Sequence, residues 1–458
     1  MMQKFKYMIQ PKNIAFIGAS NNLQKIAGKV LVNLYKTNYQ GDIFFVNNKR
    51  KEVLEKKAFS SILEIDQDID LACITTPARF VPEILEECIQ KQVKVAMILS
   101  AGFSESGPEG SLLEEKIRKI IKNENIIVYG PNTPGFFDYH NKWGISFSPR
   151  FEPKQFIPGS VGLISHGGSL ARAILDSNEK GIGFSYWFSP GNEADISVND
   201  SLEFLIEDEK TEIILLVMES LFEESRFFEL VNRAYEKNKP IILLSIGTTV
   251  ESIPAVRFHL GKKIKSLFPW DAIRHPGIIK VNSVSEMISL AWLFEYYKTS
   301  KGNKTLIFSW TGGASIYLAD LCRRFDIQLT DLSETIKKKL KDLIHIKDYY
   351  INPLDLTTLV YENVNILTES LDAVIQSDEY DNFIVLFPFQ VDYPNEVLAK
   401  EILKHSNRKK LFVPIFLSQG YHNELSLELI KQSKMPYFTD EYTAVKSLSM
   451  FINYKRSS

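Results

Sequence analysis

The sequence predicts an α/β protein in which parallel sheets are connected by crossover helices, arranged as three consecutive layered units. Short apolar runs alternate with helical stretches along most of the chain. The length of 458 residues is sufficient for about three domains of ordinary size. At three widely separated places a strand ends in a glycine turn that opens a helix: IAFIGAS, VGLISHGG and LIFSWTGG.

The composition is that of a chain with packed cores and almost no net charge. Hydrophobic residues make up 45% and charged residues 24% of the chain, as in ordinary globular proteins. The formal charge of -2 argues against general binding of nucleic acid, so any phosphate binding must be local. No apolar run approaches the ~18 residues of a membrane span, and the opening residues lack the apolar core of a signal peptide. We therefore expect a cytoplasmic protein without a nucleic-acid or membrane partner.

The three cysteines argue against a disulfide or zinc framework. Cys73, Cys88 and Cys322 show no C-x-x-C spacing and are too few to cross-link a chain of this length. We expect a reducing compartment and no metal site.

Residues 1–150 are predicted to form the first domain. Its strands are expected in the apolar runs NIAFIGAS, IFFVN, DLACITTP, VKVAMILSAGF and NIIVYGPN, and its helices in KVLVNLYK, VPEILEECIQ and LLEEKIRKIIKN. The stretch FSPRFEPKQFIPGS, rich in proline and aromatic residues, then interrupts the rhythm and marks the first boundary.

Residues 151–299 and 300–458 are predicted to form the second and third domains. The second is expected to contain strands in SVGLIS, GFSYWFSPGN, EIILLVMES and PIILLSIG, and helices in SLEFLIEDE, RFFELVNRAYEKN and EMISLAWLFEYYK. The polar segment TSKGNK serves as a linker, after which TLIFSWTGGASIYLADLCRRF begins the third α/β series.

The glycine turns have two possible roles, phosphate binding and tight packing, which the residues alone do not distinguish. Helix N-termini attract phosphate, and glycine lets a ligand approach the backbone closely. Equally, a glycine in such a turn is often there only for tight packing. A lone histidine such as His259 is usually a surface or core residue, whereas Glu219 is less ordinary because it follows an apolar strand at its carboxyl end.

Taken in order, the segments resemble the nucleoside-diphosphate-forming acyl-CoA synthetase superfamily, which includes the α subunits of succinyl-CoA synthetase and ADP-forming acetyl-CoA synthetase. The resemblance covers nearly the whole chain and rests on the ordered set IGASNNLQKIAGKVLVNL, YQGDIFFVNNK, DLACITTPARFVPEILEEC, VKVAMILSAGFSE, GPNTPG, VGLISHGGSLARAILD, GIGFSYWFSPGNEADI, TGGAS and INPLDLT. It implies a Rossmann-like CoA-binding domain followed by two flavodoxin-like, succinyl-CoA synthetase-like domains.

The resemblance also implies roles for particular residues. His259 in HLG matches the histidine that carries phosphate between an acyl phosphate and a nucleotide, and Glu219 matches its carboxylate partner. For phosphate, it indicates Gly167, Gly168, Ser169, Gly312 and Gly313. For coenzyme A, it indicates Gly18, Ala19, Ser20, Lys25, Asn47, Lys49, Thr76, Pro77, Ser100, Ala101, Gly102 and Asn132.

The resemblance further implies partners. The family's nucleotide site lies in an ATP-grasp β portion, so a separate β subunit that holds the Mg-nucleotide is expected. A small carboxylic acid or its acyl-CoA is the expected substrate, and the protein is expected to be an oligomer.

The histidine segment departs from the family pattern and leaves an alternative open. The segment GTTVESIPAVRFHLGKK, expected to be a loop, places Pro254, Phe258 and Leu260 where small residues are usual, and His166 replaces the usual Gln or Arg. The alternative is a CoA-binding or regulatory protein that has lost the phosphoryl relay. An NAD(P)-dependent dehydrogenase is disfavoured because IGAS lacks the dinucleotide fingerprint and IFFVNN ends without an acidic residue.

Overall fold

The computed structural model describes residues 2–148, 152–260, 268–300, 302–344, 350–388, 392–406, 410–417 and 424–457. It contains three mainly parallel sheets, which confirms the predicted α/β class. The chain divides into two compact units: Met1–Glu179 with Gly183–Val284, and Lys180–Ile182 with Ser285–Ser458. The two units are described separately.

The first sheet has the strand order β3-β4-β2-β1-β5-β6-β7. Its strands are β1 (Asn13–Ile17), β2 (Asp42–Val46), β3 (Glu52–Val53), β4 (Lys56–Phe59), β5 (Leu71–Ile74), β6 (Val95–Ile98) and β7 (Ile127–Tyr129). The helices are α1 (Met2–Ile9), α2 (Ile26–Lys36), α3 (Val81–Gln90) and α4 (Pro108–Ile121). Because β1 lies between β2 and β5, the order reverses there, which is where open parallel sheets bind ligands.

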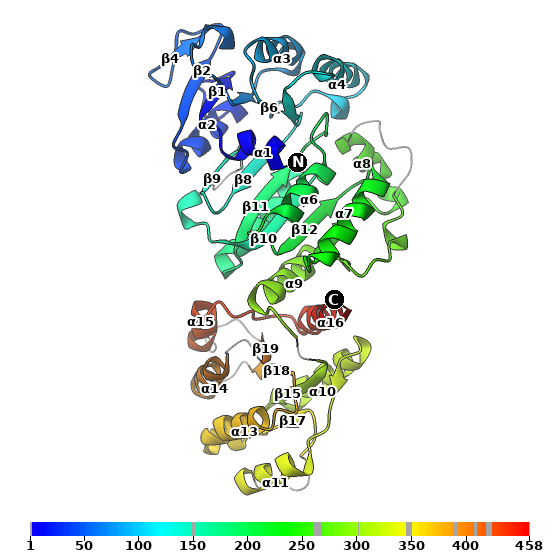
Figure 1. Cartoon of the computed structure of the whole chain (residues 1–458). Coiled ribbons are helices and arrows are strands. Elements are labelled where there is room, and N and C mark those ends of the chain that lie inside the picture. The colour runs from blue at the N-terminus through cyan, green and yellow to red at the C-terminus, as the bar shows by residue number, and fades with distance from the viewer. Residues whose placement is uncertain are drawn as a thin grey trace. The chain divides into compact units, whose positions relative to one another are not determined.

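The second sheet has the order β14-β13-β12-β10-β11-β8-β9 and lies in the same unit (Figure 1). Its strands are β8 (Gly135–Asp138), β9 (Trp143–Ser146), β10 (Pro158–Ser165), β11 (Phe184–Ser189), β12 (Ile213–Met218), β13 (Ile241–Ser245) and β14 (Ile278–Val281). The helices are α5 (Gly168–Leu175), α6 (Val198–Glu207), α7 (Glu224–Glu236) and α8 (Ile253–Leu260). The helix α9 (Val284–Tyr296) follows β14, and all of it except Val284 belongs to the second unit. In Figure 1, α6 and α7 lie side by side over this sheet.

The hairpin β8–β9 joins the two sheets of the first unit. It precedes residue 150, the expected end of the first domain, yet β8 pairs antiparallel with β11 of the second sheet. Asn33 of α2 donates to the carbonyl oxygens of Ser146 and Ser148, both at 2.9 Å, and so satisfies groups beside the free edge of β9. The division into three domains at residues 150 and 299 stays a prediction.

The core of the first unit is continuous across both sheets. One cluster of buried side chains includes Phe16 and Leu71 in the first sheet and Ile214 and Leu243 in the second. The strands β12 and β13 are apolar at almost every position because helices cover both faces of a parallel sheet.

The second unit contains the third sheet, in which β16, β15, β18 and β19 follow one another and β17 pairs with β15. The strands are β15 (Lys304–Ser309), β16 (Gln328–Leu329), β17 (Leu354–Asp355), β18 (Asn382–Phe387) and β19 (Leu411–Phe416). The helices are α10 (Gly312–Arg324), α11 (Glu334–Leu343), α12 (Leu359–Glu362), α13 (Asn365–Gln376), α14 (Asp392–His405), α15 (Glu424–Gln432) and α16 (Glu441–Ser457).

Two general observations concern the described residues. No helix among them combines the length and the apolar character needed to cross a bilayer. The thiols of Cys73, Cys88 and Cys322 are free and buried, and burial raises the pKa of each.

Candidate functional site

The carboxyl end of the second sheet brings His259 and Glu219 together. Glu219 directly follows β12, and His259 lies in the last turn of α8, which follows β13. The Nδ1 atom of His259 is 2.7 Å from Oε2 of Glu219. The Glu219 side chain is 8% exposed and the His259 side chain 51% exposed, so a buried carboxylate holds a ring that solvent and ligands can reach.

The expected histidine loop is helical up to Leu260, which corrects the interpretation of that segment. Residues Val250–Ser252 form a short 3-10 helix that begins with a capping box between Thr249 and Ser252, and α8 continues from Ile253. Pro254 lies in the first turn of α8, where the missing N–H group costs no helical hydrogen bond. Gly261, the last residue of the HLG motif, lies outside the described residues.

The geometry defines which ring nitrogen of His259 can act as a nucleophile. Because Glu219 accepts at Nδ1, that nitrogen carries the proton and the lone pair is on Nε2. The hydrogen bond to Glu219 raises the pKa of His259, burial of the ring opposes this, and the charges of Glu219 and Glu105 raise the pKa further. The imidazolium form is thus stabilised, as a charged intermediate on this ring would be.

The free edge of the His259 ring faces the N-terminus of α5. A Cβ atom on Gly167 would lie 3.2 Å from Cε1 and 3.6 Å from Nε2 of His259, so the glycine leaves the approach to the ring open. Gly167 precedes the first residue of α5 and supplies no capping side chain. The first-turn N–H groups of Gly168 and Ser169 have no partner within the helix, and such groups bind anions.

His166, which the sequence analysis noted only as a departure, anchors the backbone of Glu219. Its Nδ1 accepts the N–H group of Glu219 at 3.1 Å, so Nε2 is the donor to Oε1 of Glu193, also at 3.1 Å. The other oxygen of Glu193 accepts the N–H group of Val198 at the start of α6. The turns after β10, β11 and β12 are thereby fixed to one another.

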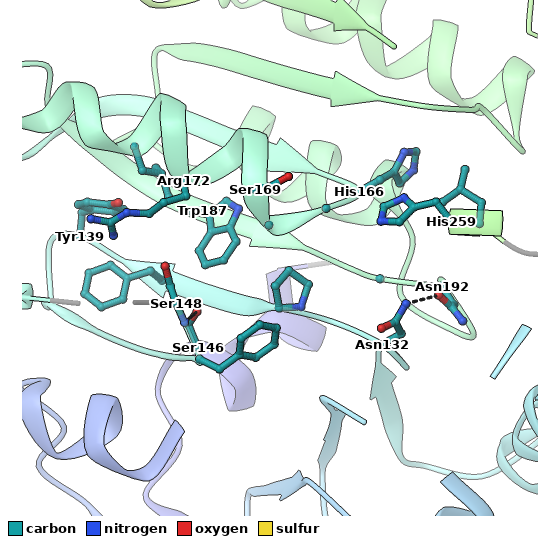
Figure 2. A pocket seen from close by; sticks show the side chains of 18 of the residues that line it. Asn132, Tyr139, Ser146, Ser148, His166, Ser169, Arg172, Trp187, Asn192 and His259 are labelled. Atoms are coloured by element: carbon teal, nitrogen blue, oxygen red, sulfur yellow. Dashed lines mark hydrogen bonds between the residues drawn. The ribbon is translucent and has the colours of Figure 1, made fainter. Parts of the chain in front are cut away.

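A second network connects this site to the first sheet. The side-chain amide of Asn192 donates to Oε2 of Glu105 at 2.6 Å, and Oε1 of Glu105 accepts the N–H group of Gly102 at 2.6 Å. Asn132 donates to the side-chain oxygen of Asn192 at 3.3 Å, the dashed line in Figure 2. Two positions predicted to bind coenzyme A, Gly102 and Asn132, are therefore coupled to the surroundings of His259.

The residues predicted to bind coenzyme A all lie at one edge of the first sheet. The strand ends align, since Ile17 pairs with Val46 and Ile74, and Ile74 pairs with Ile98. Gly18, Ala19 and Ser20 follow β1, with Lys25 just before α2; Asn47 and Lys49 follow β2; Thr76 and Pro77 follow β5; Ser100, Ala101 and Gly102 follow β6; and Asn132 follows β7.

Local features of this edge fit a cofactor that carries phosphate groups. Gly18 has φ +92°, and a Cβ atom there would lie 2.9 Å from Oγ1 of Thr75 and 3.0 Å from Cγ2 of Thr76. The amide of Asn47 donates to the carbonyl oxygen of Ala19 at 2.8 Å, which fixes the glycine turn. The buried hydroxyl of Thr76 has no partner among the described residues, and the exposed Lys25 adds positive charge.

Gly312 and Gly313 lie in the other unit, at the N-terminus of α10. A Cβ atom on Gly312 would approach Oδ2 of Asp355 to 3.3 Å, and one on Gly313 would meet open space.

A cavity of about 570 Å³ extends from His259 between α5 and the β8–β9 hairpin, and Trp187 of β11 also lines it. Figure 2 shows His166 and His259 at one end, Ser169 and Trp187 in the middle, and Arg172 and Tyr139 at the other end. Aromatic side chains line much of it: Phe137, Tyr139, Phe147, Phe156 and Trp187. The sequence analysis missed these residues, because it treated the aromatic-rich stretch around Phe147 and Phe156 as a domain boundary.

Comparisons with known proteins agree with this organisation. Residues 12–138 match the CoA binding domain family, and residues 158–294 match the family described as succinyl-CoA ligase like flavodoxin domain. The chain is 36% identical over 355 residues to an ADP-forming acetate–CoA ligase of Methanocaldococcus jannaschii, covering 77% of this chain and 49% of the relative. The chain therefore spans about half the length of that relative.

Two further matches extend along almost the whole chain. The α subunit of ADP-forming acetate–CoA ligase I of Pyrococcus furiosus is 30% identical, with 98% of this chain and 97% of the relative covered. The acetyl-coenzyme A synthetase 1 of Ca. Korarchaeum cryptofilum, solved in complex with phosphate and ADP, has a TM-score of 0.86 at 22% identity and covers 100% of this chain and 98% of its own. This structural match shows that the fold is shared.

Proposed function

Since the chain belongs to the family of ADP-forming acid–CoA ligases, we propose that it is the α-type component of such a ligase and that His259 carries the phosphoryl group. The reaction interconverts acyl-CoA, phosphate and a nucleoside diphosphate with a carboxylic acid, CoA and a nucleoside triphosphate. The observation that carries this proposal is the 2.7 Å hydrogen bond between Nδ1 of His259 and Glu219, with the opposite edge of the ring facing Gly167.

The phosphoryl transfer follows from this geometry. Nε2 of His259 attacks the phosphorus atom of an acyl phosphate, the new N–P bond replaces the bond to the acyl oxygen, and the carboxylate leaves. Glu219 holds the proton on Nδ1 and stabilises the charge on the ring throughout. The N–H groups at the start of α5, with Gly167, Gly168 and Ser169, hold the phosphoryl oxygens. Transfer from Nε2 to a nucleoside diphosphate then restores the free histidine.

The binding of coenzyme A is assigned to the carboxyl edge of the first sheet. Gly18, Ala19 and Ser20 provide the phosphate turn, Lys25 and Lys49 provide charge, and the turns at Thr76 and Ser100–Gly102 close the other side. Coenzyme A supplies the thiol that displaces phosphate from the acyl carbon of the acyl phosphate, and in the other direction phosphate displaces the thiol. The link from Gly102 through Glu105 and Asn192 supports a thiol end that lies near His259.

The nucleotide belongs to a partner in this proposal. The relative in Pyrococcus furiosus is named an α subunit, which supports a second chain that completes the enzyme. We assign the Mg-nucleotide to an ATP-grasp β subunit. Gly312 and Gly313 remain candidates for contacts with a phosphoryl group, supported by their place at the start of α10.

The test is phosphorylation of purified protein. We expect acetyl phosphate, or labelled ATP with the β subunit, to give an acid-labile, alkali-stable phosphate that intact mass and radiolabel detect. His259→Asn should abolish the label. His405→Asn is the matched control, because His405 also contacts a carboxylate, Asp372 at 2.6 Å, but lies in the other unit.

The alternative function is a CoA-binding protein without the relay. It is favoured by the placement of His259 on a helix rather than on a glycine-rich loop. Protein that binds coenzyme A by calorimetry but accepts no label from any donor would establish this alternative and contradict the ligase proposal.

A further inference from the structure

We propose that the carboxylic acid handled by this site carries an aromatic ring. The inference rests on the proposed function, because it takes the cavity beside His259 as the place of the acyl group. The size, the lining and the direction of that cavity all favour an aromatic acyl group.

The cavity is larger than a phosphoryl group and a short acid together require. Its volume of about 570 Å³ lies in the range of ~300–1,000 Å³ typical of pockets that enclose whole organic ligands. An acetyl group would add one methyl to this space and leave most of the apolar wall uncovered. Since the free energy gained on binding scales with the apolar area removed from water, such a wall favours a bulky group.

The cavity runs along α5, and its extent along this helix indicates how long the acyl group can be. Ser169, Arg172 and Leu175 line it at intervals of three residues along α5. At 1.5 Å per residue, Ser169 and Leu175 are about 9 Å apart along the helix axis. A carboxylate held beside Gly167 and Ser169 would therefore direct its substituent along α5 for several carbon atoms, away from His259.

The lining favours a flat ring over a flexible chain. The centroids of Phe137 and Tyr139 are 4.9 Å apart with an interplanar angle of 79°, and those of Phe137 and Phe156 are 5.2 Å apart at 86°. These are edge-to-face arrangements, which further aromatic rings can extend. On the neighbouring strand β11, Trp187 pairs with Phe137, is 4% exposed and donates through Nε1 to Oγ of Ser165 at 3.2 Å, which fixes the plane of its indole.

The far end of the cavity includes a charged side chain. Arg172 lies there beside Tyr139, and its guanidinium pairs with Asp176 at 2.7 Å. A group of the length of an arylalkyl acid ends at this polar boundary. A much longer aliphatic chain would have to displace the ion pair.

The test compares three CoA thioesters on the purified chain by calorimetry: acetyl-CoA, phenylacetyl-CoA and octanoyl-CoA. The last two are matched in carbon number. We expect phenylacetyl-CoA to bind about 10- to 100-fold more tightly than acetyl-CoA, from the burial of one ring. It should bind about 2- to 10-fold more tightly than octanoyl-CoA, from ring–ring contacts. Equal affinity for all three, or a preference for octanoyl-CoA, would overturn the inference.

A pair of tryptophan variants tests whether the preference for phenylacetyl-CoA arises in this cavity. Leu175→Trp fills the far half of the cavity and should reduce the advantage of phenylacetyl-CoA over acetyl-CoA about tenfold or more. Leu112→Trp makes the same change at an exposed position of α4, 67% exposed, and should behave as the unmodified protein. Circular dichroism and thermal melting confirm that both variants fold.

Phosphate labelling of His259 tests the proposed function independently of the thioester affinities, which test the aromatic substrate. Label on His259 without any preference among the thioesters would refute the aromatic substrate and leave the ligase intact. A clear preference without label would support the pocket and refute the relay. Failure of all three thioesters to bind would refute both.

Discussion

At the scale of single residues, the carboxylate of Glu219 controls the protonation of His259. In the proposed relay the neutral ring is the nucleophile, so phosphorylation should become faster as the pH rises through the pKa of His259. Because the hydrogen bond to Glu219 raises that pKa, Glu219→Gln should move the midpoint of the pH–rate profile to lower pH. It should also slow phosphorylation at high pH about 10-fold or more, since a hydrogen bond to a charged group is lost.

The rate of label incorporation from acetyl phosphate between pH 5 and 9 measures both effects. Glu223→Gln is a suitable comparison, since Glu223 is exposed and pairs with Arg226 instead. A midpoint that stays in place in Glu219→Gln would show that this carboxylate does not set the pKa of His259.

Some of the site was predictable from residue types and order, and some was not. His259 and Glu219 were both predicted as site residues, and the structure brings them together because consecutive parallel strands end at one edge of the sheet. The bond between His166 and Glu193 joins residues in different turns. No local pattern specifies it, because it depends on how far each turn extends above the sheet.

At the scale of elements, α8 buries few apolar side chains among the described residues. Its buried residues are Val256 and Leu260, which form a small cluster of their own. By contrast, α7 buries Phe227, Leu230, Val231 and Ala234. Since protection against local opening follows buried apolar contact, the amide groups of α8 should exchange with deuterium faster than those of α7.

Native-state hydrogen exchange followed by mass spectrometry measures this difference. Peptides from β12 and β13 provide the slow reference, because both strands are buried along nearly their whole length. Protection of α8 equal to that of α7 would mean that contacts other than Val256 and Leu260 hold the helix.

The elements themselves were largely predictable, because their signals are local. The apolar runs and helical stretches of the first domain correspond to β1, β2, β5, β6, β7, α2, α3 and α4. The prediction of a loop at residues 253–260 is wrong. The capping box at Thr249 starts a helical segment, and Pro254 is tolerated in the first turn of α8.

At the scale of the whole molecule, the proposed coenzyme A site predicts which segments become protected from hydrogen exchange when coenzyme A binds. Binding should slow hydrogen exchange in the turns after β1, β5 and β6 and leave β18 and β19 of the second unit unchanged. At a ligand concentration 100 times Kd, the stabilisation of the bound state is about 2.7 kcal/mol. Exchange measured with and without coenzyme A tests this, and protection confined to the second unit would contradict the assignment.

The arrangement of the whole chain was less accessible from sequence than its elements. The rhythm of strands and helices predicts the α/β class, but it does not show that β8 leaves the first sheet to pair with β11. Antiparallel pairing of these strands is a long-range choice that depends on the free edge of β11. The aromatic cavity follows from that choice, which is why its residues escaped the sequence analysis.

The position of the β8–β9 hairpin has an evolutionary consequence. The parallel strands β10, β12 and β13 lead to the residues of the proposed phosphoryl relay, whereas the edge hairpin carries Phe137, Tyr139 and, just beyond it, Phe147. These aromatic residues are distant in sequence from His259 and Glu219, so substituting them leaves the paired histidine and carboxylate unchanged. In the proposed enzyme, selection can therefore reshape the acid pocket through a few side chains of this hairpin while the residues of the relay stay in place. For the same reason, a library confined to Phe137, Tyr139 and Phe147 is the natural starting point for retargeting this scaffold to new acids.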